Sequence, residues 1–168
     1  MKSVRLFSAI MLFVVAFSFR AMSQEVLPEV RVIATRYKYL SAVNNAETPR
    51  PAKVLESKAA AYDVRNAEYY EDDYDTYFVS FIIPEGEILA AYDQTGKLLR
   101  TAEKYKNVKL PKAVADAVLE RFPNWHIAKD IYLVNYYENE GAEKIYKLLL
   151  ENGNKRLRVK ANDKGEFL

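Results

Sequence analysis

The sequence predicts an α+β fold: a tandem repeat of a helix followed by an antiparallel β-meander, with two helices packed on one face of an antiparallel sheet. Short segments rich in β-branched and aromatic residues are separated by turn signals such as PEGE, DQTG, ENGN and NDKG, a pattern typical of hairpins. Two other segments space their apolar residues with a helical period. Each precedes a run of strands, so the order of helix and meander occurs twice.

The first predicted unit covers residues 51–106. Its helix opens at a proline, which suits a first helical turn, and its apolar positions recur at helical spacing as Val54, Leu55, Ala59 and Tyr62. Turns containing Gly or Asp separate the segments that follow. We therefore expect strands at residues 77–83, at 88–92 and from 98 onward.

The second predicted unit covers residues 107–168. Leu110-Pro111 opens the helix KAVADAVLERF, and Pro123 ends it because proline disfavours helical geometry in the residue before it. Positions such as Val118 and Phe122 are expected in the core. Four strands are expected after the helix, at residues 127–137, 145–150, 157–160 and 166–168.

Two short matches favour a duplication. The triplet YYE occurs at residues 69–71 and again at 136–138, and the turn DQTG at 93–96 corresponds to NDKG at 162–165. Coincidence is an alternative in a chain with 13 tyrosines. Since one unit alone would cover its sheet poorly, two helices on one face of a combined sheet is the expected arrangement.

Residues 1–23 are predicted to be a cleaved signal peptide. Lys2 and Arg5 precede an apolar run, and Ala21-Met22-Ser23 offers a small-x-small cleavage site. The alternative, an anchoring helix, needs roughly 20 apolar residues, and Arg20 interrupts the run before that. The mature chain is then expected to begin near Gln24 and to be periplasmic or secreted from a bacterium, with no membrane span.

Charge and cysteine content exclude several function classes. Cleavage removes three basic residues and no acid, so 25 basic residues become 22 against 23 acidic ones, which argues against nucleic acid as a partner. The chain has no cysteine, so it has no disulfide framework, no thiolate chemistry and no lipid-attachment thiol.

Residues 24–50 are expected to form an N-terminal strand and a polar linker. Glu29 to Leu40 alternates polar and apolar residues and is rich in β-branched and aromatic types, which favours a strand. The following SAVNNAETPRP is polar, carries two prolines and has no period, so we interpret it as the linker.

The stretch YYEDDYDTYFVSF at residues 69–81 is interpreted as an acidic hairpin tip that leads into a strand. Alternation places Tyr77, Val79 and Phe81 on one side of the strand. A weak cation site is the alternative, because hard oxygen ligands suit calcium, although the EF-hand Gly and Glu positions are not filled. Its ligands would be Glu71, Asp72, Asp73 and Asp75; otherwise no metal is expected.

At Leu110-Pro111, Phe122-Pro123, Ile127-Ala128 and the final NDKGEFL, and in the first unit at AAYDQTGKLL, the chain resembles the PepSY-like family described as β-lactamase-inhibitor-like. The resemblance covers most of the chain from about Pro51 to its end. It implies a tandem helix-and-sheet protein of the bacterial envelope, or a secreted one, that binds a partner and could inhibit it. It implies no catalytic residue, and no inhibitory contact residue can be transferred.

No enzyme activity, catalytic residue or cofactor is expected. With no cysteine and one histidine, His126, the usual pairs of nucleophile and base are nearly exhausted. His126 is expected to be a packed or surface residue. The chain has no P-loop, GxGxxG or HExxH motif.

The abundance of tyrosine predicts a recognition surface, because tyrosine offers a large rigid contact area with a polar end. The alternative is that cross-strand aromatic pairs merely stabilise the sheet. Two functions stay open: a module that binds an unidentified protein through an exposed, tyrosine-rich sheet face, and a protein that binds a small ligand or cation with its acidic and aromatic tips. The candidate partner-binding residues are Tyr69, Tyr70, Tyr74, Trp125, Tyr136 and Tyr137.

Overall fold

The computed structural model describes residues 28–168, so the predicted signal peptide lies outside the described residues. No helix within this range is long and apolar enough to cross a bilayer. The elements, in chain order, are α2 (Pro28–Val43), α3 (Arg50–Ala61), the short 3₁₀ helix η1 (Val64–Asn66), β1 (Thr76–Ile83), β2 (Gly86–Asp93), β3 (Leu98–Lys106), α4 (Lys112–Arg121), β4 (His126–Tyr137), β5 (Gly141–Asn152) and β6 (Lys155–Asn162).

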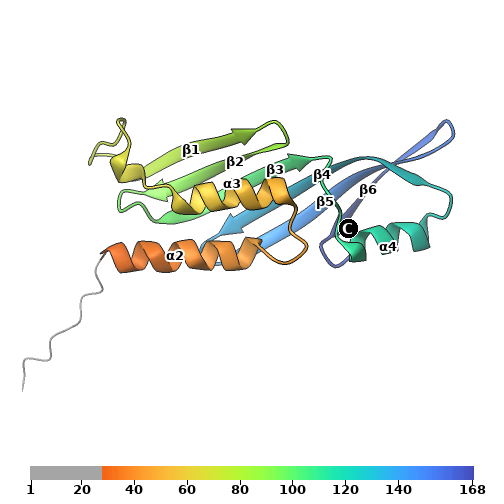
Figure 1. Cartoon of the computed structure of the whole chain (residues 1–168), viewed down its shortest axis with the longest axis horizontal. Helices are drawn as coiled ribbons and strands as arrows, with labels where there is room; N and C mark the ends of the chain where they lie inside the picture. The colour runs from red at the N-terminus through yellow and green to blue at the C-terminus, as the bar shows by residue number, and fades with distance from the viewer. Residues whose placement is uncertain (1–27) are drawn as a thin grey trace, which may run out of the picture.

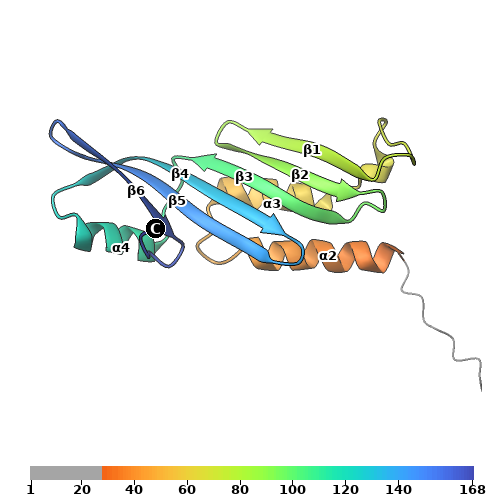
Figure 2. The same ribbon diagram turned by 180° about the vertical axis from the view of Figure 1, so that it is seen from behind.

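The six strands form one antiparallel sheet in the order β1-β2-β3-β4-β5-β6. Helices α2 and α3 lie side by side on one face (Figure 1), and the view from behind presents the opposite face without a helix over it (Figure 2). The predicted α+β class and antiparallel sheet are confirmed, with a third helix that the prediction did not include. Three strands follow α3, as expected, and three follow α4. The fourth strand predicted at residues 166–168 is wrong, because that segment makes only an isolated bridge between Phe167 and Ala161. That the two halves are a duplication stays a prediction.

The N-terminal segment is a helix, so the strand predicted for Glu29 to Leu40 is wrong. Helix α2 spans Pro28–Val43, and its buried residues Thr35, Tyr39 and Val43 recur every four positions, which places them on one helical face. That face packs on the sheet, where the Tyr39 hydroxyl donates to Glu103 Oε1 at 2.8 Å. Burial of one helical face against the sheet therefore outweighs the local preference of the alternating pattern for a strand. The predicted linker is correspondingly shorter and covers residues 44–49.

Helix α3 begins after Pro49 and carries Pro51 in its first turn, as the sequence predicts. Its buried face consists largely of alanine (Ala52, Ala59, Ala60) with Leu55 and Glu56, so the helix can approach the sheet closely. The Tyr92 hydroxyl of β2 donates to the Ala59 carbonyl at 2.7 Å, an acceptor that lies near the C-terminal end of the helix.

Helix α4 packs at the β6 end of the same face. Val118 is buried, as predicted, in the same cluster as Leu148 and Leu150 of β5. Phe122 is half-buried and meets Phe167 edge to face at 5.5 Å between ring centroids. The turn after β6 lies close against α4. A Cβ added to Gly165 (φ +84°) would lie only 2.5 Å from the Ala113 carbonyl oxygen.

The covered face of the sheet is rich in tyrosine. Seven of the 13 tyrosines are buried: Tyr39, Tyr77, Tyr92, Tyr105, Tyr132, Tyr136 and Tyr146. Tyr132 stacks on Tyr146 with 4.6 Å between ring centroids. The alternative that the sequence left open, cross-strand aromatic pairs that stabilise the sheet, therefore describes most of them.

Candidate docking face

The predicted partner-binding residues do not gather into one patch. Tyr69, Tyr74 and Tyr137 are exposed (51%, 53% and 45%), whereas Tyr136 is buried. Tyr70 and Trp125 are half-buried. Residues 69–74 belong to the loop before β1, at one end of the long axis of the molecule, and Trp125 follows α4 at the other end (Figure 1). The exposed, tyrosine-rich sheet face that the sequence predicts is therefore wrong: the tyrosine-rich face is the covered one.

The stretch at residues 69–75 is a loop between η1 and β1, not the hairpin tip predicted. The Tyr62 and Tyr69 hydroxyls are 2.5 Å apart, and Tyr70 stacks on Tyr77 with 5.3 Å between ring centroids. These contacts fold the loop back on the molecule. The alternation predicted for the following strand is confirmed, with Tyr77 buried and Phe78 and Ile82 exposed.

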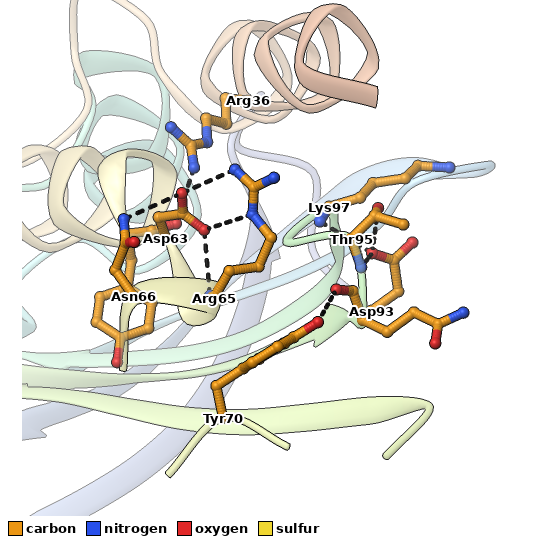
Figure 3. A network of polar contacts seen from close by, with 10 residues as sticks. Arg36, Asp63, Arg65, Asn66, Tyr70, Asp93, Thr95 and Lys97 are labelled. Carbon is orange, nitrogen blue, oxygen red and sulfur yellow. Dashed lines mark hydrogen bonds and ion pairs between the residues drawn. The ribbon is translucent and has the colours of Figure 1, made fainter. Parts of the chain in front are cut away.

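A polar network ties this loop to the turn between β2 and β3 (Figure 3). The Tyr70 hydroxyl donates to the Gln94 carbonyl at 3.0 Å, and Asp93 Oδ1 accepts from the Thr95 and Lys97 amides at 2.9 and 3.0 Å. Nearby, Asp63 pairs with Arg65 at 2.9 Å, and this hydrogen bond holds the pKa of the carboxyl below its usual range. Because these groups satisfy one another, we assign the network a structural role.

The acidic residues of the loop do not form a metal centre. Glu71, Asp72, Asp73 and Asp75 are all exposed, and the described residues contain no group of three or more His, Cys, Asp or Glu side chains placed to hold a metal ion. His126 is exposed at the start of β4, with its Nε2 3.8 Å from Glu151 Oε2.

Two glutamates lie buried between the helices and the covered face. Glu103 accepts hydrogen bonds from the hydroxyls of Tyr39, Thr101 and Tyr105 at 2.7 to 2.8 Å. Glu56 of α3 is fully buried, and neither of its carboxyl oxygens has a hydrogen-bond partner in the described structure. Burial, followed by repulsion from Glu103, raises the pKa of Glu56 to about 8. Glu56 is thus mostly protonated at neutral pH, which limits the penalty of burying it.

The opposite face of the sheet, which we call the docking face, has no helix over it in the described part of the chain (Figure 2). Its apolar side chains include Phe78, Ile82 and Leu89, all classed as exposed. Over β1 to β4 it forms a shallow depression of about 440 Å³, lined by residues that include Leu89, Ala102 and Leu133. The lining also includes Ser80, Asn135 and an ion pair between Glu87 and Lys104 at 3.8 Å, so this part of the face is mixed and carries no excess of one charge.

Over β4 to β6 the docking face becomes basic. A second depression, of about 450 Å³, has a lining that includes the apolar Ile131 and Leu149, the buried Asp130, whose carboxylate accepts from the Val108 amide, and four cations that we call the basic cluster: Lys129, Lys147, Arg158 and Lys160. All four are exposed. The face thus changes from mixed, with paired charges, to cationic along the sheet.

The register of the strands brings these cations together. Lys147 is directly opposite Lys160 in the pairing of β5 with β6, and Leu149 lies between Lys129 on β4 and Arg158 on β6. Like charges directly opposite on neighbouring strands destabilise a sheet. The nearby Glu151 on β5 is paired with Arg156 at 2.9 Å, and none of the ion pairs in residues 28–168 includes a member of the basic cluster.

The basic cluster was not predicted from the sequence. Two of its members, Arg158 and Lys160, stand two apart on β6, and such alternation places them on one face. The sequence therefore contained the signal that these cations share a face. The convergence of all four members depends on the register between β4, β5 and β6, which the local pattern does not specify.

Comparison with known proteins adds little to this geometry. No family model matches the chain, and no curated protein matches it. Among solved structures, a BLIP-like protein from Bacteroides fragilis is similar, with 24% sequence identity, coverage of 58% of this chain and 68% of that chain, and a TM-score of 0.33. At this score the likeness carries no argument about function, so the docking face is judged on its own residues.

Proposed function

We propose that this protein is a non-enzymatic binding module that docks an acidic surface of a partner protein on its uncovered sheet face. The observation that carries the proposal is the basic cluster: four exposed cations, two of them directly opposite on paired strands, around an apolar depression. In the isolated protein this arrangement is unfavourable. Carboxylates of a partner would relieve the repulsion while its apolar side chains cover Ile131 and Leu149.

The mixed chemistry of the face supports a protein partner. Interfaces combine an apolar centre with charged groups that direct orientation and association rate, and the docking face offers Leu89 and Leu133 beside the cations. Nucleic acid is a poorer fit, since residues 24–168 carry no excess of basic over acidic residues.

We extend the proposal to location and ancestry. The N-terminal sequence pattern supports export to the periplasm or beyond, and the order of helix and three strands, found twice in the chain, supports a duplicated PepSY-like unit. An inhibitor-like role on an enzyme of the cell envelope is consistent with this location. No residue of the docking face is assigned a catalytic part.

The test is a capture experiment with two variants of equal charge. The chain from residue 24 is compared with a docking variant (Lys129→Gln, Lys147→Gln, Arg158→Gln, Lys160→Gln) and with a control in which four other exposed cations are neutralised (Lys38→Gln, Arg50→Gln, Lys58→Gln, Lys109→Gln). Each is incubated with envelope extract of the native host. We expect a partner that the wild type and the control retain, that the docking variant loses, and that salt releases.

Three outcomes would contradict the proposal. If the docking variant retains the same partner, the basic cluster is not the contact. Equal loss from both variants would mean that net charge alone governs retention. If the wild type retains no protein, the docking role fails, and the small-ligand alternative would be tested next by a thermal-shift screen.

A further inference from the structure

The two edges of the sheet have opposite chemistry. The β6 edge carries Lys155, Arg156, Arg158 and Lys160, and the chain after it returns along the strand, since the Leu168 amide donates to the Lys160 carbonyl at 3.0 Å. Charged side chains and a covering segment are two ways in which proteins prevent edge-to-edge association. The β6 edge uses both.

The β1 edge uses neither. Its eight residues read TYFVSFII and include no charge. In the described chain, β1 pairs with β2 alone, and no turn, loop or cap hydrogen bond involves its backbone. Since alternate residues of an antiparallel strand direct their N–H and C=O groups away from the partner strand, β1 presents a row of unpaired backbone groups. Beside that row, Phe78 is 57% and Ile82 is 72% exposed.

A second copy of β1 complements this edge in one register in particular. If two β1 strands run antiparallel about a two-fold axis at Ser80, Phe78 lies opposite Ile82 of the partner subunit, and Val79 lies opposite Phe81 of the partner subunit. The two most exposed apolar side chains of the strand then cover each other. A shift of the axis to Val79 would place Phe78 opposite a serine, and a shift to Ile82 would bring Pro84, which lacks an N–H, opposite Ser80.

We propose that the protein forms a two-fold symmetric homodimer in which the β1 strands pair about Ser80 and join two six-stranded sheets into one. Such an isologous interface closes on itself, so it removes the exposed edge without leading to a filament. The proposal does not depend on the docking face, because the basic cluster lies on β4 to β6. The dimer would carry two docking faces.

The first test is the mass of the chain from residue 24, measured by light scattering over a hundredfold range of concentration. We expect a dimer that dissociates on dilution. Ser80→Lys and Ser80→Glu each place like charges opposite one another at the axis, so we expect each variant to have half the wild-type mass. An equimolar mixture of the two should recover the dimer, because unlike charges then meet.

A disulfide cross-link tests the register independently. The chain has no cysteine, so Ser80→Cys introduces a single thiol, which at the axis would lie within the separation of about 7 Å between Cα atoms that a disulfide tolerates. We expect a covalent dimer on oxidation, lost on reduction, and none from Ser57→Cys on the exposed side of α3. A monomeric wild type would overturn the proposal, as would a dimer that survives Ser80→Lys and resists cross-linking at residue 80.

Discussion

On the covered face of the sheet, tyrosines of β3, β4 and β5 stack on one another. The buried Glu103 accepts hydrogen bonds there from the hydroxyls of two tyrosines and one threonine. On the docking face, the same strands present lysine, arginine and isolated apolar side chains to solvent. The covered face therefore holds polar atoms that are mostly satisfied within the fold. The docking face holds the basic cluster, whose four charges lack ion-pair partners among residues 28–168.

From this difference we expect the covered face to determine the stability of the fold and the docking face to determine binding. Substitutions of the packed tyrosines and of the tight glycine contact on the covered face should lower the free energy of unfolding, and replacing the buried Glu56 should alter its pH dependence, without creating or removing a contact surface. Substitutions on the docking face should alter association while stability changes little or even rises, as is common where function opposes stability. Four measurements test this contrast between the two faces.

The largest effect is expected for Tyr132→Ala on the covered face. Tyr132 is buried, and its ring lies 4.6 Å from that of Tyr146 and 5.9 Å from that of Tyr105. Removing the ring leaves a cavity and should lower the free energy of unfolding by about 3 to 5 kcal/mol, as measured by urea denaturation. Leu89→Ala on the docking face is the matched control, expected to cost less than about 1 kcal/mol. Similar losses for the two would contradict the contrast.

Next in size is Glu56→Gln, which removes a buried carboxyl. The pKa of about 8 in the folded state lies above the ordinary glutamate value expected in the unfolded chain, so the folded state holds a proton that the unfolded state releases. The stability that this proton confers is complete at acidic pH and declines as the pH rises toward 8. We expect the variant to exceed the wild type by on the order of 3 kcal/mol at alkaline pH.

Thermal unfolding across the pH range checks this expectation. The difference in melting temperature between Glu56→Gln and the wild type should grow from about pH 5 to about pH 8 and then level off. A difference that does not vary with pH would mean that Glu56 titrates normally.

A smaller loss is expected for Gly165→Ala, which tests how closely α4 is held on the covered face. The residue has φ +84°, and a Cβ would lie 2.5 Å from the Ala113 carbonyl oxygen. Gly141→Ala is the matched control, with φ +87° and no atom within 4 Å of the added carbon. Backbone strain of roughly 1 kcal/mol is common to both, so the further loss in Gly165→Ala, about 1 kcal/mol or more, measures the steric clash. Equal melting temperatures would mean that α4 moves aside freely.

The smallest effect is expected for Lys147→Gln. It is a gain in the free energy of unfolding at an exposed position. Loss of one of two facing lysines should raise the free energy of unfolding by up to about 0.5 kcal/mol at low salt, and the gain should shrink as salt screens the repulsion. Lys38→Gln on α2 serves as the comparison. A loss of stability that persists in high salt would indicate that Lys147 has a stabilising contact.

Much of the fold could be predicted from the sequence because the turns are strongly marked. Each predicted strand from residue 77 to 160 overlaps a strand of the structure, since Gly, Asp and Asn punctuate the chain between apolar runs. Residues 29–40 were predicted wrongly for the opposite reason. There the local alternation matches a strand, and the helical spacing of Thr35, Tyr39 and Val43 becomes decisive only once a sheet is present to bury them.

The candidate site was harder to predict. Tyr136 shares its face of β4 with Val134 and Tyr132, two and four residues away, so alternation alone could have placed it in the core. The basic cluster could not be predicted from alternation alone, because it depends on the register between strands. Lys147 and Lys160 lie opposite each other in a register that is set by the turn between β5 and β6 together with the buried face of the sheet.

The order of the strands has a consequence for how the chain folds. Every strand pairs with its neighbour in sequence. The ladders within β1 to β3 and within β4 to β6 can therefore close hairpin by hairpin with little loop entropy lost at each step, whereas pairing of β3 with β4 must close the longer connection that contains α4. Helix α2 is an exception, since it contacts β3, β4 and β5, which are synthesised long after it. We therefore expect hairpin formation to precede docking of α2, and a stopped-flow experiment should detect substitutions at Tyr39 in the unfolding rate more than in the refolding rate.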